Sequence, residues 1–172
     1  MNTQIFLLIN NAAGRWPWLD RFMVFSAEYL MWAMVLVLLV LLATNYNRWK
    51  KLVLVSFVSA IVARGIIASI IKYFYSHPRP YWTIVETHLL LAKETQSSFP
   101  SGHTIFVFAL ATGVYLYNKK WGGWYILLAC LVGFSRVFVG VHWPLDIMAG
   151  AVLGIATALV CNWGLKKYKY VV

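Results

Sequence analysis

The sequence predicts an all-α integral membrane protein, folded as a bundle of helices. Hydrophobic residues make up 62% of the 172 residues and charged residues only 12%, whereas soluble domains are roughly 45–50% apolar. Long apolar runs recur along the chain, and the first has residues 32–43 at its centre. A helix needs about 20 such residues to cross a hydrocarbon core of about 30 Å. We therefore expect one membrane-embedded domain over residues 1–172.

Five apolar segments are candidates for transmembrane helices. They cover about residues 22–44, 52–73, 102–117, 121–139 and 145–165. Residues 1–20 are half apolar and contain the break Gly14-Arg15-Trp16-Pro17-Trp18, which predicts an interfacial helix followed by a turn. The first ten residues lack the basic start and long apolar run of a secretory signal, so we expect the chain to keep this segment.

Basic residues predict the orientation of these helices. They gather between the first two spans (Arg48, Lys50, Lys51), between the third and fourth (Lys119, Lys120) and in the tail (Lys166, Lys167, Lys169). Short loops rich in Lys and Arg stay in the cytoplasm. The N-terminus, the loop over residues 73–100 and the turn at 140–144 are then extracytoplasmic.

The net charge of +10 does not indicate a nucleic-acid partner. A nucleic-acid-binding protein concentrates its basic residues on one water-facing surface, but here they separate apolar segments. Cys130 and Cys161 both fall inside apolar runs, so we expect neither a disulfide nor a metal site from them.

Three polar motifs lie where helices are expected to end on the extracytoplasmic side. Lys72 precedes Arg79-Pro80, Pro100-Ser101-Gly102-His103 opens the third span, and Ser135-Arg136 precedes His142 and Asp146. Taken one at a time, these residues have ordinary interpretations. Lys72 could be a lysine reaching from a helix end to the interface, Ser101 a helix N-cap and His142 an interfacial histidine.

Taken together, the motifs suit a phosphate site. Lys72, Arg79 and Arg136 are three cations for nonbridging phosphate oxygens, and each Arg can bind in a bidentate manner. The helix N-terminus at Ser101-Gly102 would add backbone N–H donors, and glycine permits close approach.

The two motif histidines can divide the chemistry. Asp146 follows His142 by four residues, so its carboxylate can reach back to the imidazole if Pro144 is the first residue of the last helix. Such a carboxylate orients the ring and stabilises its cation. We therefore expect His142 to attack phosphorus and His103 to protonate the leaving oxygen. No cluster has metal-ligand spacing, and we expect no cofactor.

These three motifs resemble the complete signature of the type 2 phosphatidic acid phosphatase superfamily. The resemblance implies a metal-independent phosphatase that works through a phosphohistidine. It makes His142 the nucleophile and His103 the proton donor, with Asp146 orienting His142. The phosphate-binding positions are Lys72, Arg79, Ser101, Gly102 and Arg136, with Ser135 as a further donor. Members commonly have six spans, so the first would here be reduced to residues 1–20.

A second resemblance concerns the substrate. Ile5-Phe6, Leu19-Asp20, Met23-Val24 and Glu28-Tyr29 are similar to positions in bacterial undecaprenyl-diphosphate phosphatases of the bacitracin-resistance type. This implies hydrolysis of undecaprenyl diphosphate at the outer face of the bacterial cytoplasmic membrane. Phosphatidylglycerophosphate, phosphatidate or another lipid phosphate is the alternative substrate. A catalytically silent lipid-binding protein is a third possibility, which the complete set of charged motif residues disfavours. The oligomeric state is open.

Four residues outside the signature have a packing interpretation. Glu28 and Arg64 lie in or near apolar segments, where an unpaired charge is costly, so we expect them to form an ion pair; a catalytic role is the less favoured alternative. Gly150 and Gly154 would allow close packing with a helix of this chain or of another subunit.

The loop over residues 73–100 is longer than a compact connection needs, which is typical of a functional loop. It contains His77 and His88, which either contact a diphosphate or are simply solvated.

Overall fold

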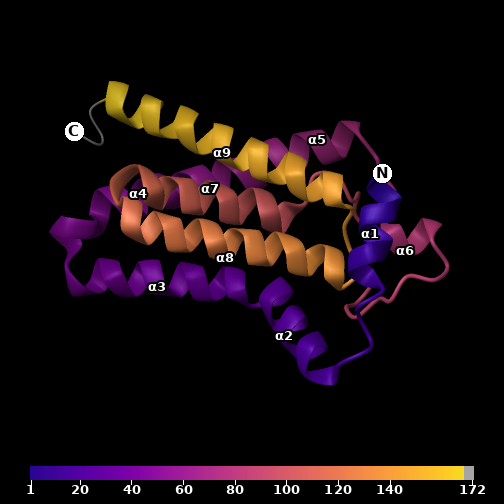
Figure 1. The fold of residues 1–172 in the computed structure, drawn as a ribbon. Helices are drawn as coiled ribbons and strands as arrows, with labels where there is room; N and C mark the ends of the chain where they lie inside the picture. Colours follow the sequence, from indigo (N-terminus) through magenta and orange to yellow (C-terminus); the bar gives the residue numbers. More distant parts are fainter. Residues whose placement is uncertain (169–172) are drawn as a thin grey trace.

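The computed structural model describes residues 1–168, so Lys169 of the basic tail lies outside the described residues. All regular elements in this range are helices, as predicted (Figure 1). They are α1 (Asn2–Asn10), α2 (Pro17–Glu28), α3 (Leu30–Thr44), α4 (Tyr46–Ile61), the π-helical segment η1 (Val62–Ala68), α5 (Ser69–Phe74), α6 (Pro80–Thr83), α7 (Gly102–Tyr117), α8 (Lys119–Phe138) and α9 (Pro144–Lys167).

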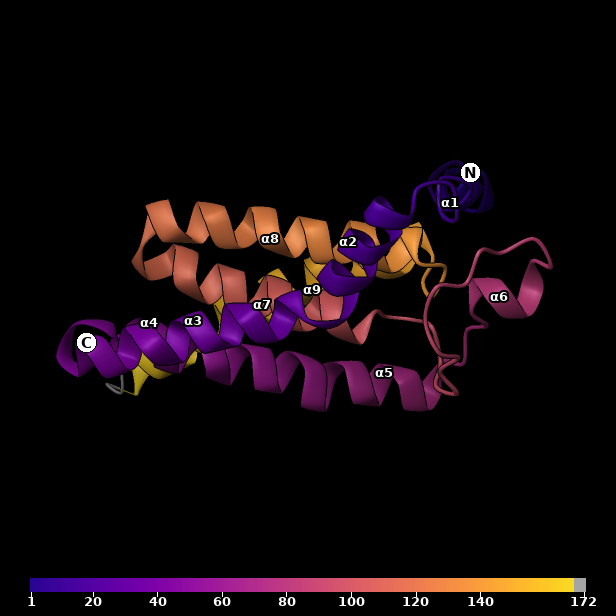
Figure 2. The same cartoon turned by 90° about the horizontal axis from the view of Figure 1, so that it is seen from below.

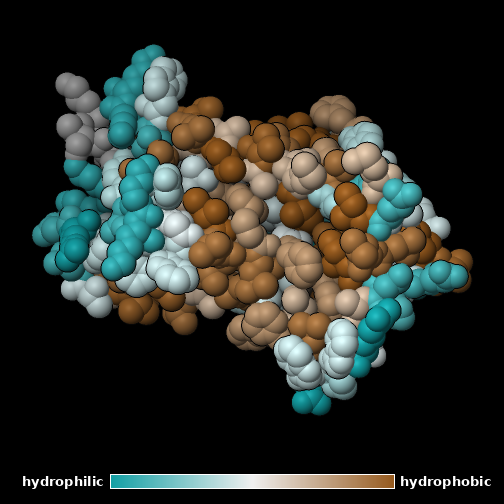
Figure 3. Space-filling view, in the orientation of Figure 1, coloured by the Kyte–Doolittle hydropathy of each residue, from teal (hydrophilic) through white to brown (hydrophobic). Residues whose placement is uncertain are grey.

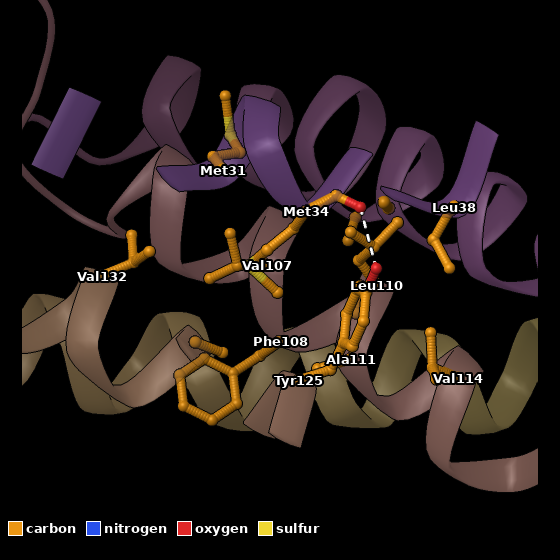
Figure 4. Close-up of a cluster of buried hydrophobic side chains, with 14 of the residues drawn as sticks. Met31, Met34, Leu38, Val107, Phe108, Leu110, Ala111, Val114, Tyr125 and Val132 are labelled. Carbon is orange, nitrogen blue, oxygen red and sulfur yellow. Dashed lines mark hydrogen bonds between the residues drawn. The ribbon is translucent and has the colours of Figure 1, made fainter. Parts of the chain in front are cut away.

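Helix α7 forms the centre of the bundle. It packs most extensively against α9, α8 and α4, and its residues from Thr104 to Val114 are almost all buried. Met34 and Leu38 of α3 complete this core from one side (Figure 4). The Tyr125 hydroxyl of α8 donates a hydrogen bond of 2.9 Å to the Met34 carbonyl, which satisfies a polar group that burial would otherwise make costly.

Two glycines bring α9 against α7. A Cβ added to Gly154 would lie 2.6 Å from the Ile105 carbonyl oxygen, and one added to Gly150 would lie 3.1 Å from Thr104 Cβ. Larger side chains at these positions would push the helices apart. The close packing predicted for this glycine pair is therefore present, and its partner is α7 of the same chain.

Three continuous helices are long and apolar enough to cross a membrane: residues Tyr46–Phe74, Lys119–Phe138 and Pro144–Lys167. The pair α2 and α3 qualifies as a fourth span if it is counted together, and α7 is shorter. The predicted total of five spans is thus not confirmed.

The region of the first predicted span, residues 22–44, is divided between α2 and α3. The helix pair begins at Pro17 and bends by 54° between α2 and α3. Different packing partners explain the bend. Met23 and Ala27 of α2 pack near Phe138 and Val141, whereas α3 packs into the main core.

The two ends of the bundle carry different segments of the chain. The α3–α4 turn, the α7–α8 turn and the end of α9 lie together at one end (Figure 1). Hydrophilic surface gathers at both ends, and a hydrophobic band lies between them (Figure 3). The basic loci thus share one end, as predicted, and α1 and α6 lie at the other.

The end opposite the basic loci is covered by α1 and by the long segment between α5 and α7. This segment contains α6 and extends beyond the bundle (Figure 2). The Asn10 side chain of α1 connects the parts of this cover by hydrogen bonds. Its side-chain amide donates to the Phe138 carbonyl at 2.8 Å and to the His88 carbonyl at 2.9 Å, and its amide oxygen accepts from the His88 backbone at 2.9 Å. Residues 1–20 are therefore bonded to the end of α8 and to the long loop.

Candidate active site

A cavity of about 250 Å³ opens at this covered end. Four segments supply its lining: Arg64, Ala68, Ser69 and Lys72 from the α4–η1–α5 rod, Glu94 and Gln96 from the long loop, Gly102 and His103 from the start of α7, and His142 from the turn before α9. Residues from all three polar motifs thus meet in one cavity, although Lys72 and His142 are 70 positions apart in the sequence.

The turn between α8 and α9 fixes His142. Gly140 has a φ of +86°, a conformation that suits glycine, and Pro144 is the first residue of α9, as the sequence analysis required. The Asp146 carboxylate accepts from the Trp143 backbone at 2.9 Å and lies 3.4 Å from His142 Nδ1. With Nδ1 on this side, Nε2 is the nitrogen that the ring can offer to the cavity.

Ser98 is a site residue that the sequence analysis missed. Its buried hydroxyl donates to Asp146 Oδ2 at 2.5 Å and lies 3.3 Å from His142 Nδ1. His77 approaches the same carboxylate, with 3.9 Å between Nδ1 and Asp146 Oδ1. Ser98 lies in a polar loop 48 residues before Asp146, so no helical spacing in the sequence relates the two residues. The one sequence signal for a role in the site is that Ser98 comes just before Phe99-Pro100-Ser101.

Burial lowers the pKa of His142 to about 4, and the guanidinium groups of Arg136 and Arg79 act in the same direction, while the hydrogen bond with Asp146 opposes them. The imidazole is therefore neutral at ordinary pH. A neutral ring has the lone pair that a nucleophile needs.

Arg79 is fully buried and bonded on every side. Its Nε donates to the Gln96 carbonyl at 3.0 Å, one terminal nitrogen to the Val141 carbonyl at 2.9 Å and the other to Glu94 at 2.6 Å. It thereby joins the long loop to the turn that carries His142.

Glu94 lies between two guanidinium groups. Its carboxylate accepts from Arg79 at 2.6 Å and from Arg136 at 2.5 Å. Burial raises the pKa of Glu94, but Arg136 and Arg79 outweigh this effect and bring it to about 2. Glu94 is thus an anion whose oxygens accept from two guanidinium groups, as the oxygens of a phosphate also can.

Ser101 and Ser135 are buried and already hydrogen-bonded. The Ser101 hydroxyl accepts from Thr104 at 3.1 Å, and its backbone N–H donates to the Asp146 carbonyl at 3.2 Å. The Ser135 hydroxyl donates to the Val132 carbonyl one turn earlier at 2.8 Å. Their phosphate contacts remain predictions.

The predicted ion pair between Glu28 and Arg64 is not formed. Arg64 instead lines the cavity, with 3.5 Å between a terminal nitrogen and the Met31 sulfur, and none of the ion pairs among residues 1–168 includes it. The packing interpretation failed because the turn at Tyr29 directs α2, and Glu28 with it, toward the end of α8. Lys72, two turns further along the rod, donates to the Ser97 carbonyl at 2.9 Å.

The described residues contain no group of three or more His, Cys, Asp or Glu that could hold a metal ion. Cys130 and Cys161 are both free thiols.

The chain is similar to known membrane enzymes. It is 33% identical over 171 residues to the bacitracin transport permease protein BcrC of Bacillus licheniformis, covering 99% of this chain and 84% of the relative. It is 38% identical over 161 residues to an undecaprenyl-diphosphatase of Sulfolobus acidocaldarius, covering 89% and 73%. The crystal structure of Aquifex aeolicus LpxE superposes with a TM-score of 0.77 at 32% identity over 93% of each chain. Residues 53–170 match the PAP2 superfamily, and this match spans all three motifs. The chain therefore belongs to the PAP2 superfamily.

Proposed function

We propose that this protein hydrolyses undecaprenyl diphosphate to undecaprenyl phosphate and inorganic phosphate. The observation that carries the proposal is the buried imidazole of His142, held by Asp146 and facing a cavity lined by cations. Relatives 33–38% identical over most of this chain bear the names BcrC and undecaprenyl-diphosphatase. The superfamily makes the chain a hydrolase of lipid phosphates, and these relatives favour a lipid diphosphate.

In the proposed first step, His142 Nε2 attacks the terminal phosphorus. A nitrogen–phosphorus bond forms while the bond from that phosphorus to the bridging oxygen breaks. His103, at the start of α7 and in the same cavity, donates a proton to the departing oxygen. Undecaprenyl phosphate leaves, and the phosphoryl group stays on His142.

In the second step, water attacks the phosphohistidine. His103 accepts a proton from that water, the nitrogen–phosphorus bond breaks and inorganic phosphate is released with His142 neutral again. Asp146 stabilises the positive charge on the phosphorylated ring. Ser98 holds the carboxylate in place through its short hydrogen bond.

The transferred phosphate would be bound by Lys72, Arg79, Arg136 and the backbone N–H groups around Gly102. For this, Glu94 gives up its place on the two guanidinium groups to the phosphate. Roles for Ser101 and Ser135 require their hydroxyls to exchange a protein partner for phosphate.

The cavity would face the extracytoplasmic side of a bacterial cytoplasmic membrane. This follows from the basic loci at the opposite end of the bundle, because such loci remain in the cytoplasm. We take residues 1–172 as one catalytic domain, since the cavity lining comes from segments spread between Arg64 and His142.

The proposal is tested by phosphate release from purified protein in detergent. We expect kcat/KM for undecaprenyl diphosphate to exceed that for phosphatidylglycerophosphate and phosphatidate by at least about tenfold, which needs only about 1.4 kcal/mol of extra transition-state binding. His142→Ala protein, prepared in parallel, measures release by contaminating phosphatases. A preference for either glycerolipid monophosphate would refute the proposed substrate.

A further inference from the structure

Arg64 is a cation in the membrane-spanning rod that has no counter-ion among residues 1–168. It is exposed within the helix Tyr46–Phe74, where the neighbouring Ile66 and Ile70 are also exposed, as expected of a lipid-facing surface. Within residues 1–168, its guanidinium has one hydrogen-bond partner, the Met31 sulfur, and no carboxylate pairs with it. A charge at such a position is expensive and indicates a functional partner. Since the described residues supply no counter-ion, a bound ligand is the candidate.

The position of Arg64 within the cavity indicates what this partner is. Arg64 precedes Lys72 by eight residues on one rod, roughly 12 Å toward the hydrophobic band at the helical rise of 1.5 Å per residue. Arg64 nevertheless reaches the start of α7, because a Cβ on Gly102 would lie 4.0 Å from its Nε. The backbone of Arg64 therefore lies on the membrane side of Lys72, and its side chain lies beside the helix turn that carries His103.

The π-helical segment explains how both cations face one cavity. In a regular α-helix, eight residues rotate the side chain by about 800°, so Arg64 and Lys72 would point about 80° apart. The segment Val62–Ala68 is π-helical, and its wider turns rotate each residue by less. This reduces the angle between the two side chains. Insertions of this kind are frequent at functional sites.

We propose that Arg64 binds the lipid-linked phosphate of a diphosphate substrate, and that it thereby selects diphosphates over monophosphates. The proposal rests on the function proposed above. The lipid tail lies in the bilayer, so the phosphate attached to it must lie on the membrane side of the phosphate that His142 receives. Arg64 lies on that side, whereas Lys72 and Glu94 line other parts of the cavity, and Glu94 is paired with Arg79 and Arg136.

The chemistry of the leaving group gives Arg64 a task that a monophosphate does not require. When the terminal phosphorus transfers to His142, negative charge grows on the oxygens of the lipid phosphate. A guanidinium beside those oxygens binds them in a bidentate manner and neutralises this charge. A lipid monophosphate places only an alcohol oxygen and apolar chain at this position, so it would gain nothing from Arg64.

The test compares two substrates with one lipid tail, farnesyl diphosphate and farnesyl monophosphate. Arg64→Gln should lower kcat/KM for the diphosphate by about 10- to 100-fold, the expected size of a charged hydrogen bond, and change that for the monophosphate less than about threefold. Arg64→Lys keeps the charge but loses the paired N–H donors of the guanidinium, so its kcat/KM for the diphosphate should lie between those of the wild type and Arg64→Gln. Inhibition by pyrophosphate should weaken in Arg64→Gln, and inhibition by orthophosphate should not.

Equal losses for both substrates, or no loss for the diphosphate, would overturn the role of Arg64. The pyrophosphate measurement needs no turnover, so it decides the matter even if the variant is slow. Arg48→Gln is the matched control, because Arg48 stacks on Trp49 at the other end of the same rod and should leave both activities unchanged. Failure of the proposed function is separately visible, since wild-type protein would then hydrolyse the monophosphate in preference to the diphosphate, and the role of Arg64 would fall with it.

Discussion

The two walls of the cavity are built on different principles. In the imidazole wall, His142 lines the cavity with Asp146 and Ser98 behind it, and these buried side chains are bonded to one another. The cation wall, formed by Arg64 and Lys72 on the α4–η1–α5 rod, is more exposed, and only Lys72 has an oxygen partner. On the roles proposed above, the imidazole wall is complete before substrate arrives, whereas the cation wall is completed by the charge that substrate brings.

This difference separates chemistry from selection. Groups that react must be held in position in advance, because each loses catalytic efficiency when it has to be reorganised during the reaction. Groups that recognise a ligand can remain unpaired before it binds, because the free energy that an unpaired charge costs is offset when the ligand pairs with it. Changes in the imidazole wall should therefore affect every substrate alike, and changes in the cation wall should affect substrates unequally.

The largest effect is expected from His142→Ala. Removing the nucleophile should lower kcat by roughly 10⁴-fold or more with every lipid phosphate tested, as for other covalent catalysts. It should also abolish an acid-labile covalent phosphate, measured by trapping labelled protein after rapid quenching. Retained turnover, or a retained covalent phosphate, would contradict the assignment of His142.

The pH dependence of kcat/KM should come next in size. His142 must be neutral to attack, and its pKa of about 4 lies below the ordinary value of 6.5. Activity should therefore persist as pH falls through 6 and decline about tenfold per unit only below about pH 4. Glu94, with a pKa of about 2, stays ionised through this range.

Asp146→Asn gives this pH profile a second check. The carboxylate raises the pKa of His142, so its removal should move the acid limb to lower pH while it also lowers the maximal rate. A wild-type limb near pH 6.5 would mean that His142 is hydrated and that the imidazole wall is not closed. A shift to higher pH in the variant would contradict the interaction between Asp146 and His142.

The smallest effect is expected from Glu94→Gln, at the position where the long loop meets Arg79 and Arg136. The amide keeps the shape but no longer competes as an anion for Arg79 and Arg136. Inhibition by orthophosphate should strengthen by roughly threefold, a modest change because the Glu94 side chain is 40% exposed and solvent screens its charge. Glu86→Gln, in an exposed part of the same loop, is the control. Weaker inhibition would show that Glu94 does not occupy a phosphate position.

The sequence predicted local features of the fold well. Helix type and approximate bounds follow from apolar runs, and the start of α9 follows from Pro144 with Asp146 two residues later. The bend at Tyr29 left no such mark, since neither Pro nor Gly stands there. It results from α2 and α3 packing on different partners, which are residues far away in the sequence.

The same division applies to the site. Lys72, Gly102, His103 and His142 belong to motifs whose spacing indicates their chemistry, and they line one cavity. Ser98 and Glu94 belong to no motif and reach the site through the path of a long loop. The sequence favours an ion pair for Arg64, because it shows which charges lie within apolar helices. It does not show which way each helix faces, and this decides whether two such charges meet.

The bonds of Asn10 also bear on the order in which the enzyme becomes complete. Asn10 binds a loop near His88 and the end of α8 at Phe138, so a segment made first finds its partners only after most of the chain has been synthesised. The cover of the cavity cannot close on a nascent protein, and neither can His142 meet Asp146 before α9 begins. Hydrolytic activity should thus arise only when insertion is nearly finished, which keeps partly inserted chains from acting on lipid phosphates.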